Sequence, residues 1–500
     1  MNTNLETIPS NDHSQIKEHR GFPKEFWLFL LSEFFERIAF YGIRWALVLY
    51  FVMNISPDDT HARTDANTYY ASYLALLYGA GVVGGFLSDR VFGHQNSIIL
   101  GALLMMSGIF SLLLPDPLIF RFSLACIALG NGLYKPAMCI TVGRILGIST
   151  PKRDAGFTLF YLVINIAGLL APLLTQFFAI TVFGTGNDIA FKSIFISSAG
   201  SMLLSLLCFF VGRSKLKGTA FFQKFQIEKK LGIYCAFGVP ALLALLSVML
   251  SFESSVLTSL LIALLFVSLL MLYFESKQHG TRDLHGFFPL VVVLVLNLLL
   301  HLINGNVIHS CTLIAMKWMA LNPELGASTS LMLRAGEINA LFLMSPLMVL
   351  IWLTIGKRNW YPRVEQKLGL GIIAASLGFG IFSYSANQLF QGNMSLPIWP
   401  MFVAYIFQAI SELCLIPISL SAITYFAPAR RGGLAIGSLY ITISLGTHLA
   451  GFLHQVGGPQ GELDMSVIAN EIQQGFYFSL ALGSLILVIS SILSKFRGSN

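Results

Sequence analysis

Four ionisable residues lie inside one long apolar stretch near the start of this 500-residue chain. Residues 27–53 read WLFLLSEFFERIAFYGIRWALVLYFVM and contain Glu33, Glu36, Arg37 and Arg44. About 20 such residues suffice to cross a bilayer, where each ionised group costs about 2.5–3.5 kcal/mol and usually has a functional role. The stretch therefore predicts a membrane helix that carries either a polar functional site or an ion-pair network that only holds helices together.

The spacing of these charges places most of them on one face of the predicted helix, close to Tyr41. Residues three or four positions apart are neighbours on a helix surface, and a charged face cannot contact lipid tails. We expect this face to look into a polar cavity or towards opposite charges on other helices.

Lys135 lies in the middle of a second apolar run, NGLYKPAMCITVG (131–143), directly before Pro136. An unpaired ammonium group is costly in a membrane helix, so Lys135 requires a carboxylate. The glutamates of the first predicted helix are the nearest candidates.

Other polar side chains interrupt later apolar runs. Tyr161 and Asn165 are one helical turn apart, and Glu412 is the only carboxylate deep in its run. Asn165 and Glu412 either form structural hydrogen bonds between helices or belong to a functional site. The remaining polar candidates are Asn306, Ser310 and Asn339.

The composition is that of an all-α polytopic membrane protein. Hydrophobic residues make up 55% of the chain and charged residues 11%, against about 25% charged in soluble domains, and the mean hydropathy is +0.73. The net charge of +7 lies in short loops, where basic residues orient helices, so no nucleic-acid partner is expected. The six cysteines show no paired spacing and predict neither disulfides nor a metal site.

Apolar runs of about 18 or more residues predict about fourteen transmembrane helices. They lie near 25–53, 68–88, 96–114, 118–146, 156–182, 192–212, 232–250, 255–274, 288–318, 328–354, 368–388, 397–426, 433–456 and 474–494. Several exceed ~25 residues and are expected to tilt or bend. An even number of spans places both termini on the same side of the membrane.

Basic residues mark one side of the predicted protein. Lys and Arg gather in the loops near 17–24, 90, 152–153, 213–230, 277–282, 357–367, 430–431 and 495–497, whereas the other loops carry mainly Asp and Glu. Basic loops stay cytoplasmic. We therefore expect the protein in the cytoplasmic (inner) membrane with both termini in the cytoplasm.

The most basic of these loops divides the chain. We predict a cytoplasmic tail (1–22) that is not a signal peptide, an N-terminal six-helix bundle (23–213), a basic linker (214–230), an inserted helix pair (231–276) and a C-terminal six-helix bundle (286–496). Two facing bundles with a site near the midplane are typical of secondary transporters. The inserted pair is interpreted as a lipid-facing structural element. The chain lacks a Gly-Lys-Ser/Thr phosphate-binding motif, which argues against ATP-driven transport.

The loop after the second predicted helix, GGFLSDRVFGHQ (84–95), carries Asp89 and Arg90. Its glycine pair permits close helix packing, and its charges can cap and pair at a helix end, although a plain solvated loop is the alternative. The loop resembles the Gly-x-x-x-Asp-Arg pattern of the major facilitator superfamily, with His94 and Gln95 in place of further basic residues. The resemblance implies that Asp89 and Arg90 act in conformational gating.

Several motifs, in the same order, resemble those of the proton-dependent oligopeptide transporters within that superfamily. EFFERIAFYG (33–42) is similar to the family motif Glu-x-x-Glu-Arg-Phe-x-Tyr-Tyr-Gly, FYLVIN (160–165) to Phe-Tyr-x-x-Ile-Asn, and ELCLIPISLS (412–421) to Glu-Leu-x-x-x-Pro-x-x-Leu-Ser. Lys135 and Pro136 match a further motif. The likeness extends from about residue 24 to 455 and implies the major facilitator fold, with an inserted helix pair like that of bacterial members.

The resemblance implies a monomeric importer of dipeptides and tripeptides, with no enzymatic activity and no cofactor beyond the proton gradient. The residues expected to receive the peptide carboxylate are Arg37, Arg44 and Lys135. Those expected around the peptide amino group are Glu412, Asn165 and Asn339. The remaining expected substrate contacts are Tyr41, Tyr78, Tyr161, Asn306 and Ser310.

Proton coupling is expected at Glu33, Glu36, Arg37 and Lys135. A glutamate paired with a cation stays ionised, and its protonation releases the cation to bind the substrate carboxylate. An inward proton flow would then drive uptake.

The chain departs from the family pattern in the seventh main helix. Gly305 stands where many members carry a glutamate. Either His309 or Glu337 substitutes for that carboxylate, or the first helix alone supplies the coupling.

Three alternative functions remain open. A transporter of the same fold for another small zwitterion or anion, such as an amino-acid derivative or nitrate, differs only in its substrate; Glu412 opposite the arginines favours a solute with both an amine and a carboxylate. An intramembrane enzyme would need a metal cluster, a Ser-His pair or paired carboxylates facing water, and His301, His309 and His448 lie on separate turns or helices. A receptor would bind substrate without uptake.

Overall fold

The computed structural model describes residues 21–497 apart from 58–59, 185–188, 217–236, 253, 279–280, 322–335, 358–360, 392–398, 429 and 457–464. Within the helices, the side chains of 254, 281–283, 285, 306–321, 337–339, 389–390, 451–456, 465–468 and 492–497 are also outside the described part. The described residues form helices joined by turns and short connections, without a strand. The prediction of an all-α protein is confirmed.

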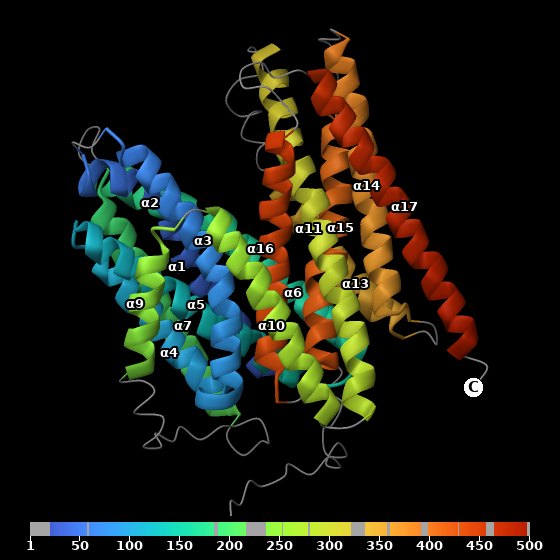
Figure 1. Cartoon of the computed structure of the whole chain (residues 1–500), viewed down its shortest axis with the longest axis horizontal. Coiled ribbons are helices and arrows are strands. Elements are labelled where there is room, and N and C mark those ends of the chain that lie inside the picture. The colour runs from blue at the N-terminus through green and yellow to red at the C-terminus, as the bar shows by residue number, and fades with distance from the viewer. Residues whose placement is uncertain are drawn as a thin grey trace, which may run out of the picture.

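The N-terminal bundle has six spans, coloured blue to green in Figure 1. They are α1 (Lys24–Arg44) with α2 (Leu47–Tyr50) and the π-helical η2 (Phe51–Ile55), α3 (Ala62–Leu87) with η3 (Ser88–Phe92), α4 (His94–Ser111), α5 (Pro117–Leu146), α6 (Thr150–Gln176) with η4 (Phe177–Val182), and α7 (Phe191–Lys215). Asp116 shows how the sequence starts such a helix. Its carboxylate accepts the backbone N–H groups of Leu118 and Ile119 at 2.8 and 2.9 Å, while Pro117 has no N–H to satisfy.

The first span is bent, in keeping with the expectation for the longest apolar runs. α1 and the segment Leu47–Ile55 meet at 43°. The backbone N–H of Ala46 donates to Ile43 O at 3.0 Å, which tightens the last turn of α1, and the indole N–H of Trp45 donates to Thr175 Oγ1 on α6 at 2.9 Å. These bonds end α1 directly after Arg44.

The inserted pair consists of α9 (Val239–Met249) and α10 (Ser254–Gln278). The C-terminal bundle contains α11 (Thr281–Leu321), α13 (Gly336–Ile355), α14 (Val364–Phe390), α15 (Trp399–Phe426), α16 (Gly432–Val456) and α17 (Met465–Arg497). The predicted linker 214–230 lies largely outside the described residues. α11 and α17 begin earlier than the predicted positions 288 and 474, because their polar first turns do not count as apolar sequence but still continue the helix.

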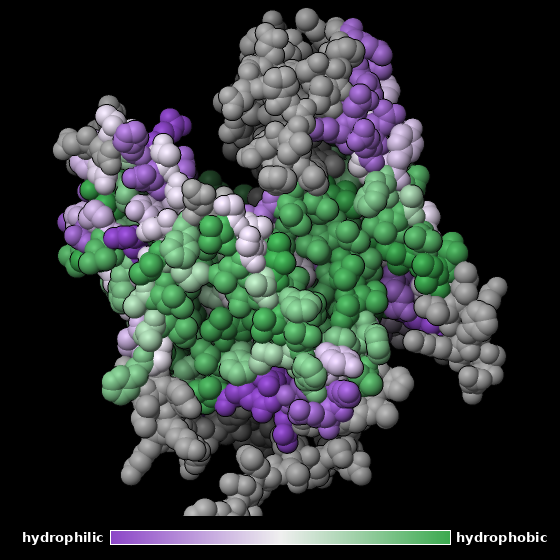
Figure 2. Space-filling view, viewed as in Figure 1, coloured by the Kyte–Doolittle hydropathy of each residue, from purple (hydrophilic) through white to green (hydrophobic). Residues whose placement is uncertain are grey.

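The described helices agree with a protein that crosses the membrane many times. Ten are long and apolar enough to span a bilayer, or eleven when the bent first pair counts as one span. The other three of the predicted fourteen are α4, α9 and α13. Figure 2 shows the resulting surface, a broad hydrophobic belt with hydrophilic residues towards its ends.

Glycines bring α3 of the N-terminal bundle against α16 of the C-terminal bundle. A Cβ atom on Gly85 would lie 2.2 Å from Gly433 O, and a Cβ atom on Gly437 would lie 2.4 Å from Gly81 O. Glycines at such positions let helix backbones approach closely. The two bundles are therefore in direct backbone contact along these helices.

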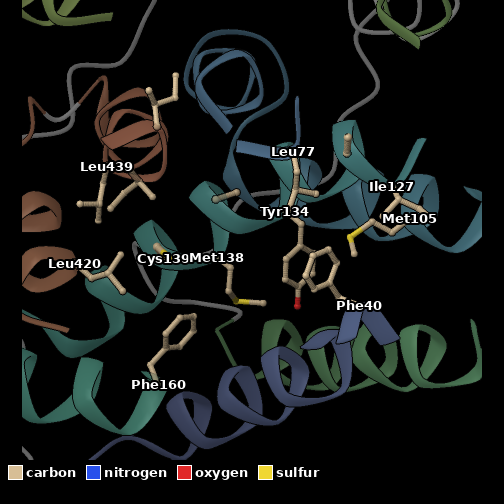
Figure 3. Packing of buried hydrophobic residues seen from close by; sticks show 14 of the residues in the cluster. Phe40, Leu77, Met105, Ile127, Tyr134, Met138, Cys139, Phe160, Leu420 and Leu439 are labelled. Carbon is tan, nitrogen blue, oxygen red and sulfur yellow. The ribbon is translucent and has the colours of Figure 1, made fainter. Parts of the chain in front are cut away.

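A single apolar core continues across the two bundles. Figure 3 shows Phe40 of α1 and Met138 of α5 in the same cluster as Leu420 of α15 and Leu439 of α16. Each of these four side chains is buried. The buried polar candidates Glu33, Glu36, Arg37 and Lys135 are thus surrounded by closely packed helices.

One end of the bundles carries the basic loops, and we refer to it as the basic-loop end. α3, α5 and α15 end there. Arg90 lies in η3 directly after α3, Arg153 in the first turn of α6, and Arg431 directly before α16.

Candidate functional site

Glu36 and Arg37 form a fully engaged ion pair on α1. The guanidinium group donates from Nε to Glu36 Oε2 and from Nη2 to Oε1, and Asn131 Nδ2 on α5 donates to the same Oε1 at 3.3 Å. The Glu36 side chain is completely buried. Both of its carboxylate oxygens therefore have hydrogen-bond donors.

Glu33, one turn earlier on α1, forms an ion pair with Lys135 of α5. Glu33 Oε1 accepts from Lys135 Nζ and lies 3.7 Å from Arg37 Nε. Its other oxygen, Oε2, is buried and has no hydrogen-bond partner among the described residues. The predicted pairing of Lys135 with a glutamate of the first helix is therefore present. Glu33, unlike Glu36, has one carboxylate oxygen that accepts no hydrogen bond from the described residues.

The four charges form one compact, buried and electrically neutral group. Two carboxylates are matched by one guanidinium and one ammonium group, and aromatic rings complete the surroundings of both cations. Arg37 lies over the rings of Phe40 and Tyr41, at 4.7 and 5.9 Å from their centroids. Lys135 lies 5.2 Å from the centroid of Phe160. Such burial makes any unmatched charge expensive.

Arg44 lies at the end of α1 and is only partly buried. Its Nε donates to Tyr70 Oη of α3 at 2.7 Å. Tyr41 and Tyr78 are likewise partly exposed. These side chains are therefore less enclosed than the buried group.

Glu412 of α15 joins the two bundles through a contact near the middle of α6 and α15. Tyr161 Oη of α6 donates to Glu412 Oε2 at 2.7 Å, and Asn165 Nδ2 donates to the Tyr161 carbonyl at 2.9 Å. Glu412, Tyr161 and Asn165 are all partly exposed. The second bundle therefore contributes a carboxylate to the helix face that carries the predicted tyrosine and asparagine.

Three expected substrate contacts, Asn306, Ser310 and Asn339, have side chains outside the described residues, as do His309 and Glu337. The neighbouring Gly305 is described. A Cβ atom there would lie 2.7 Å from Ala450 Cβ on α16, so α11 packs closely on α16 where many family members carry a glutamate.

Asp89 connects the two bundles at the basic-loop end. Its carboxylate accepts the backbone N–H groups of Gly433 and Leu434, both at 2.9 Å, and lies 3.2 Å from His94 Nε2. It therefore caps α16 of the opposite bundle, where a helix N-terminus favours a negative charge. Arg90 donates from Nη2 to Glu275 Oε2 of α10 at 2.6 Å.

A second polar junction at this end was missed from the sequence. Lys367 Nζ of α14 donates to Asp154 Oδ2 of α6 at 2.5 Å, and Tyr361 Oη donates to the same oxygen at 2.7 Å. Burial and the adjacent carboxylate raise the pKa of Tyr361, which keeps its hydroxyl proton. Asp154 and Lys367 stand near the ends of apolar runs, where a charge normally indicates a solvated loop.

Arg153 adds a further link at the same place. Its Nη1 donates to the carbonyls of Gly143 and Gly147 at 2.7 and 2.8 Å, and its Nη2 donates to Thr424 Oγ1 of α15. Among the described residues no group of three or more His, Cys, Asp or Glu is placed to hold a metal ion.

These features define the class of protein. Two six-helix bundles with an inserted pair form the major facilitator fold, and charged side chains on the facing helices of both bundles are the arrangement of a secondary transporter. The chain belongs to the POT family, whose model matches residues 95–458. Members of this family are transporters, not enzymes.

Individual relatives cover nearly the whole chain. It is 28% identical over 499 residues to the "Uncharacterized transporter YclF" of Bacillus subtilis (strain 168), with 95% of both chains covered. It is 24% identical over 497 residues to "Dipeptide and tripeptide permease A" of Serratia proteamaculans (strain 568), with 97% of this chain and 94% of the relative covered. A crystal structure of a peptide transporter POT mutant in complex with alafosfalin has a TM-score of 0.64 at 25% identity, with 95% of this chain and 96% of that chain covered.

Proposed function

We propose that this protein is a proton-coupled symporter that imports dipeptides and tripeptides across the cytoplasmic (inner) membrane by alternating access. The observation that carries the proposal is the neutral, buried group on α1 and α5, together with Glu412 on the opposite bundle. The group can exchange a proton for a substrate charge, and Glu412 can bind the other end of a zwitterion.

The two ends of the substrate would bind to different bundles. Arg37, Arg44 and Lys135 of the N-terminal bundle would receive the peptide carboxylate, which suits the forked donors of guanidinium groups. Glu412 would receive the amino group while the Tyr161 hydroxyl keeps the carboxylate oriented. A zwitterion that bridges the bundles gives a direct physical reason for closure around it.

The remaining contacts belong to the same proposal. Tyr41, Tyr78 and Tyr161 are partly exposed and suit the peptide backbone and side chains. We also assign substrate contacts to Asn165, Asn306, Ser310 and Asn339.

Proton coupling would begin at Glu33. Its unpartnered Oε2 can take a proton without losing an existing hydrogen bond. The buried group would then carry a net positive charge, because Lys135 and Arg37 would face only the Glu36 carboxylate. A substrate carboxylate restores neutrality, so proton and peptide bind together.

The polar junctions at the basic-loop end would form the cytoplasmic gate. Asp89 caps α16 across the interface, and Lys367 pairs with Asp154 across it. The described structure is therefore closed at this end. We infer that both termini lie on the same, cytoplasmic side and that a monomer completes the cycle.

The relatives support the substrate class. One is named a dipeptide and tripeptide permease, and a solved peptide transporter of similar fold binds alafosfalin.

Uptake by proteoliposomes tests the proposal. A labelled dialanine-type peptide should accumulate only with an inward proton gradient, and tripeptides but not free amino acids should compete. Accumulation that persists without the gradient would overturn proton coupling. Competition by free amino acids, or gradient-driven uptake of an amino-acid derivative instead of the peptide, would favour the second candidate, a transporter of another small zwitterion.

A further inference from the structure

The inserted helix pair is attached to the N-terminal bundle at the end remote from the basic loops. Ser72 Oγ of α3 donates to Phe252 O at 3.0 Å, and Arg121 Nη1 of α5 donates to Ser251 Oγ at 3.2 Å. Phe252 and Ser251 belong to the connection between α9 and α10. This connection is therefore fastened to α3 and α5.

Along its length α10 lies over the seam between the two bundles, as Figure 1 shows. Leu261 packs on α3, with its Cδ2 atom 3.1 Å from the position of a Cβ on Gly79. On the other side, Ser438 Oγ of α16 donates to Ser268 Oγ of α10 at 2.9 Å. A lipid-facing helix with no further role would need no polar contact with the second bundle.

At the basic-loop end, Glu275 in the last turn of α10 binds one arginine from each bundle. Its Oε2 accepts from Arg90 Nη2 of the N-terminal bundle at 2.6 Å and from Arg431 Nε of the C-terminal bundle at 3.0 Å. The Glu275 side chain is 6% exposed. Arg431 is held further by the ring of Phe86, 5.1 Å from its guanidinium carbon.

We propose that the inserted helix pair is a clasp on the basic-loop end and that Glu275 is its positioning residue. The pair stays with the N-terminal bundle through its contacts at the opposite end and binds Arg431 only while the bundles are closed. Without the carboxylate, Arg90 and Arg431 face each other as like charges, so neutralisation of Glu275 favours opening. Figure 2 shows a hydrophilic patch at the lower end of the belt, below α10.

Distance measurements between spin labels test the clasp. Labels introduced as non-canonical amino acids at Ile148 and Lys357 report the separation of the bundles, because both positions are exposed loops at this end of opposite bundles. In Glu275→Gln the ratio of the short to the long distance population should fall about tenfold, the effect of one lost charge-assisted contact. Lys277→Gln, an exposed charge two residues along α10, should leave the ratio unchanged.

A charge exchange separates the clasp from a general loss of stability. Glu275→Arg combined with Arg431→Glu keeps the same three charges and should restore the short distance, while each single change should lose it. An unchanged ratio in Glu275→Gln, or a double variant that is as open as the single ones, would overturn the proposal. The clasp rests on the proposed function only in one respect: it requires that the two bundles close and separate during alternating access. The measurement needs no substrate, so failed peptide uptake with an intact clasp response would count against the substrate and not against the clasp.

Discussion

Lys135 of α5 and Glu33 of α1 are paired in the interior of the N-terminal bundle, yet only one oxygen of the glutamate takes part. Glu33 Oε1 accepts from the ammonium group and Oε2 has no described partner. Glu36, one turn further along α1, uses both of its oxygens. Two glutamates of the same motif therefore have different hydrogen-bonding environments, so their substitution should have different effects.

Glu33→Gln should abolish proton-driven accumulation while peptide exchange continues. The amide cannot be protonated, and Lys135 would remain permanently available to the substrate carboxylate. Counterflow of labelled peptide should keep at least half of its rate, and gradient-driven uptake should fall more than tenfold. Glu25→Gln in the first turn of α1 is the matched control. Uphill uptake at the normal rate in Glu33→Gln would contradict the assignment.

Glu36→Gln should act mainly on stability. It removes the carboxylate that binds Arg37 at two points and leaves the buried guanidinium group with only the more distant Glu33, whose Oε1 lies 3.7 Å from Nε. Breaking a buried ion pair in this way costs about 3–5 kcal/mol. Thermal unfolding in detergent should show a clearly lower Tm than in the exposed control Asp65→Asn. Uptake should also be lost, and proton-driven uptake at the wild-type rate would exclude Glu36 from the coupling group.

Tyr161→Phe should weaken peptide binding without uncoupling transport. The change removes the hydroxyl that donates to Glu412 at 2.7 Å and is worth about 1 kcal/mol, so the KM for a dipeptide should rise about fivefold. Tyr384→Phe, at an exposed tyrosine, serves as the control. A loss of gradient dependence at unchanged KM would show that the pair belongs to coupling instead of binding.

Asp89→Asn should open the basic-loop end. The carboxylate uses Oδ1 for the Gly433 N–H and Oδ2 for the Leu434 N–H, whereas an amide has a single acceptor oxygen. One of the two bonds to the N-terminus of α16 is therefore lost and the other loses its charge assistance, which costs about 1 kcal/mol or more in total. The Ile148 and Lys357 labels should report a longer distance. Retention of the short distance would mean that the glycine contacts alone keep this end closed.

Gly305→Ala should destabilise the protein, whereas Gly200→Ala should not. A Cβ at 305 meets Ala450 at 2.7 Å, and a Cβ at 200 meets nothing within 4 Å. Overpacking of this kind costs about 1–3 kcal/mol. Equal Tm values for the two variants would show that α11 and α16 can separate at this point. The same crowding explains the absence of a carboxylate at position 305, because a larger side chain has no space there.

The sequence allowed the membrane class, most helix positions and the pairing of Lys135 with a glutamate of the first helix to be predicted, because charges inside apolar runs are conspicuous. Lys135 needed a carboxylate, and only the first helix offered one nearby. Glu275, Asp154 and Lys367 could not be assigned in the same way. Each stands near the end of a run, where the side chain turns either to water or into the interface, and only the packing of the two bundles decides which.

The sequence also could not show that Glu33 and Glu36 differ in how many of their carboxylate oxygens accept a hydrogen bond. The two residues share a motif and a helix face, so their spacing predicts one common environment. The difference arises from Arg37, which donates to both oxygens of Glu36, and from Lys135, which donates to only one oxygen of Glu33.

The glycine contacts between α3 and α16 have a mechanical consequence. Where Gly85 meets Gly433 and Gly81 meets Gly437, backbone touches backbone with no side chain between them. Such a surface acts as a hard stop: it sets how far the bundles can approach and contains no interlocking parts that must be withdrawn before they separate. The closed arrangement can therefore be reached repeatedly in the same register, and the polar bonds at its edge add to the strength with which it is held.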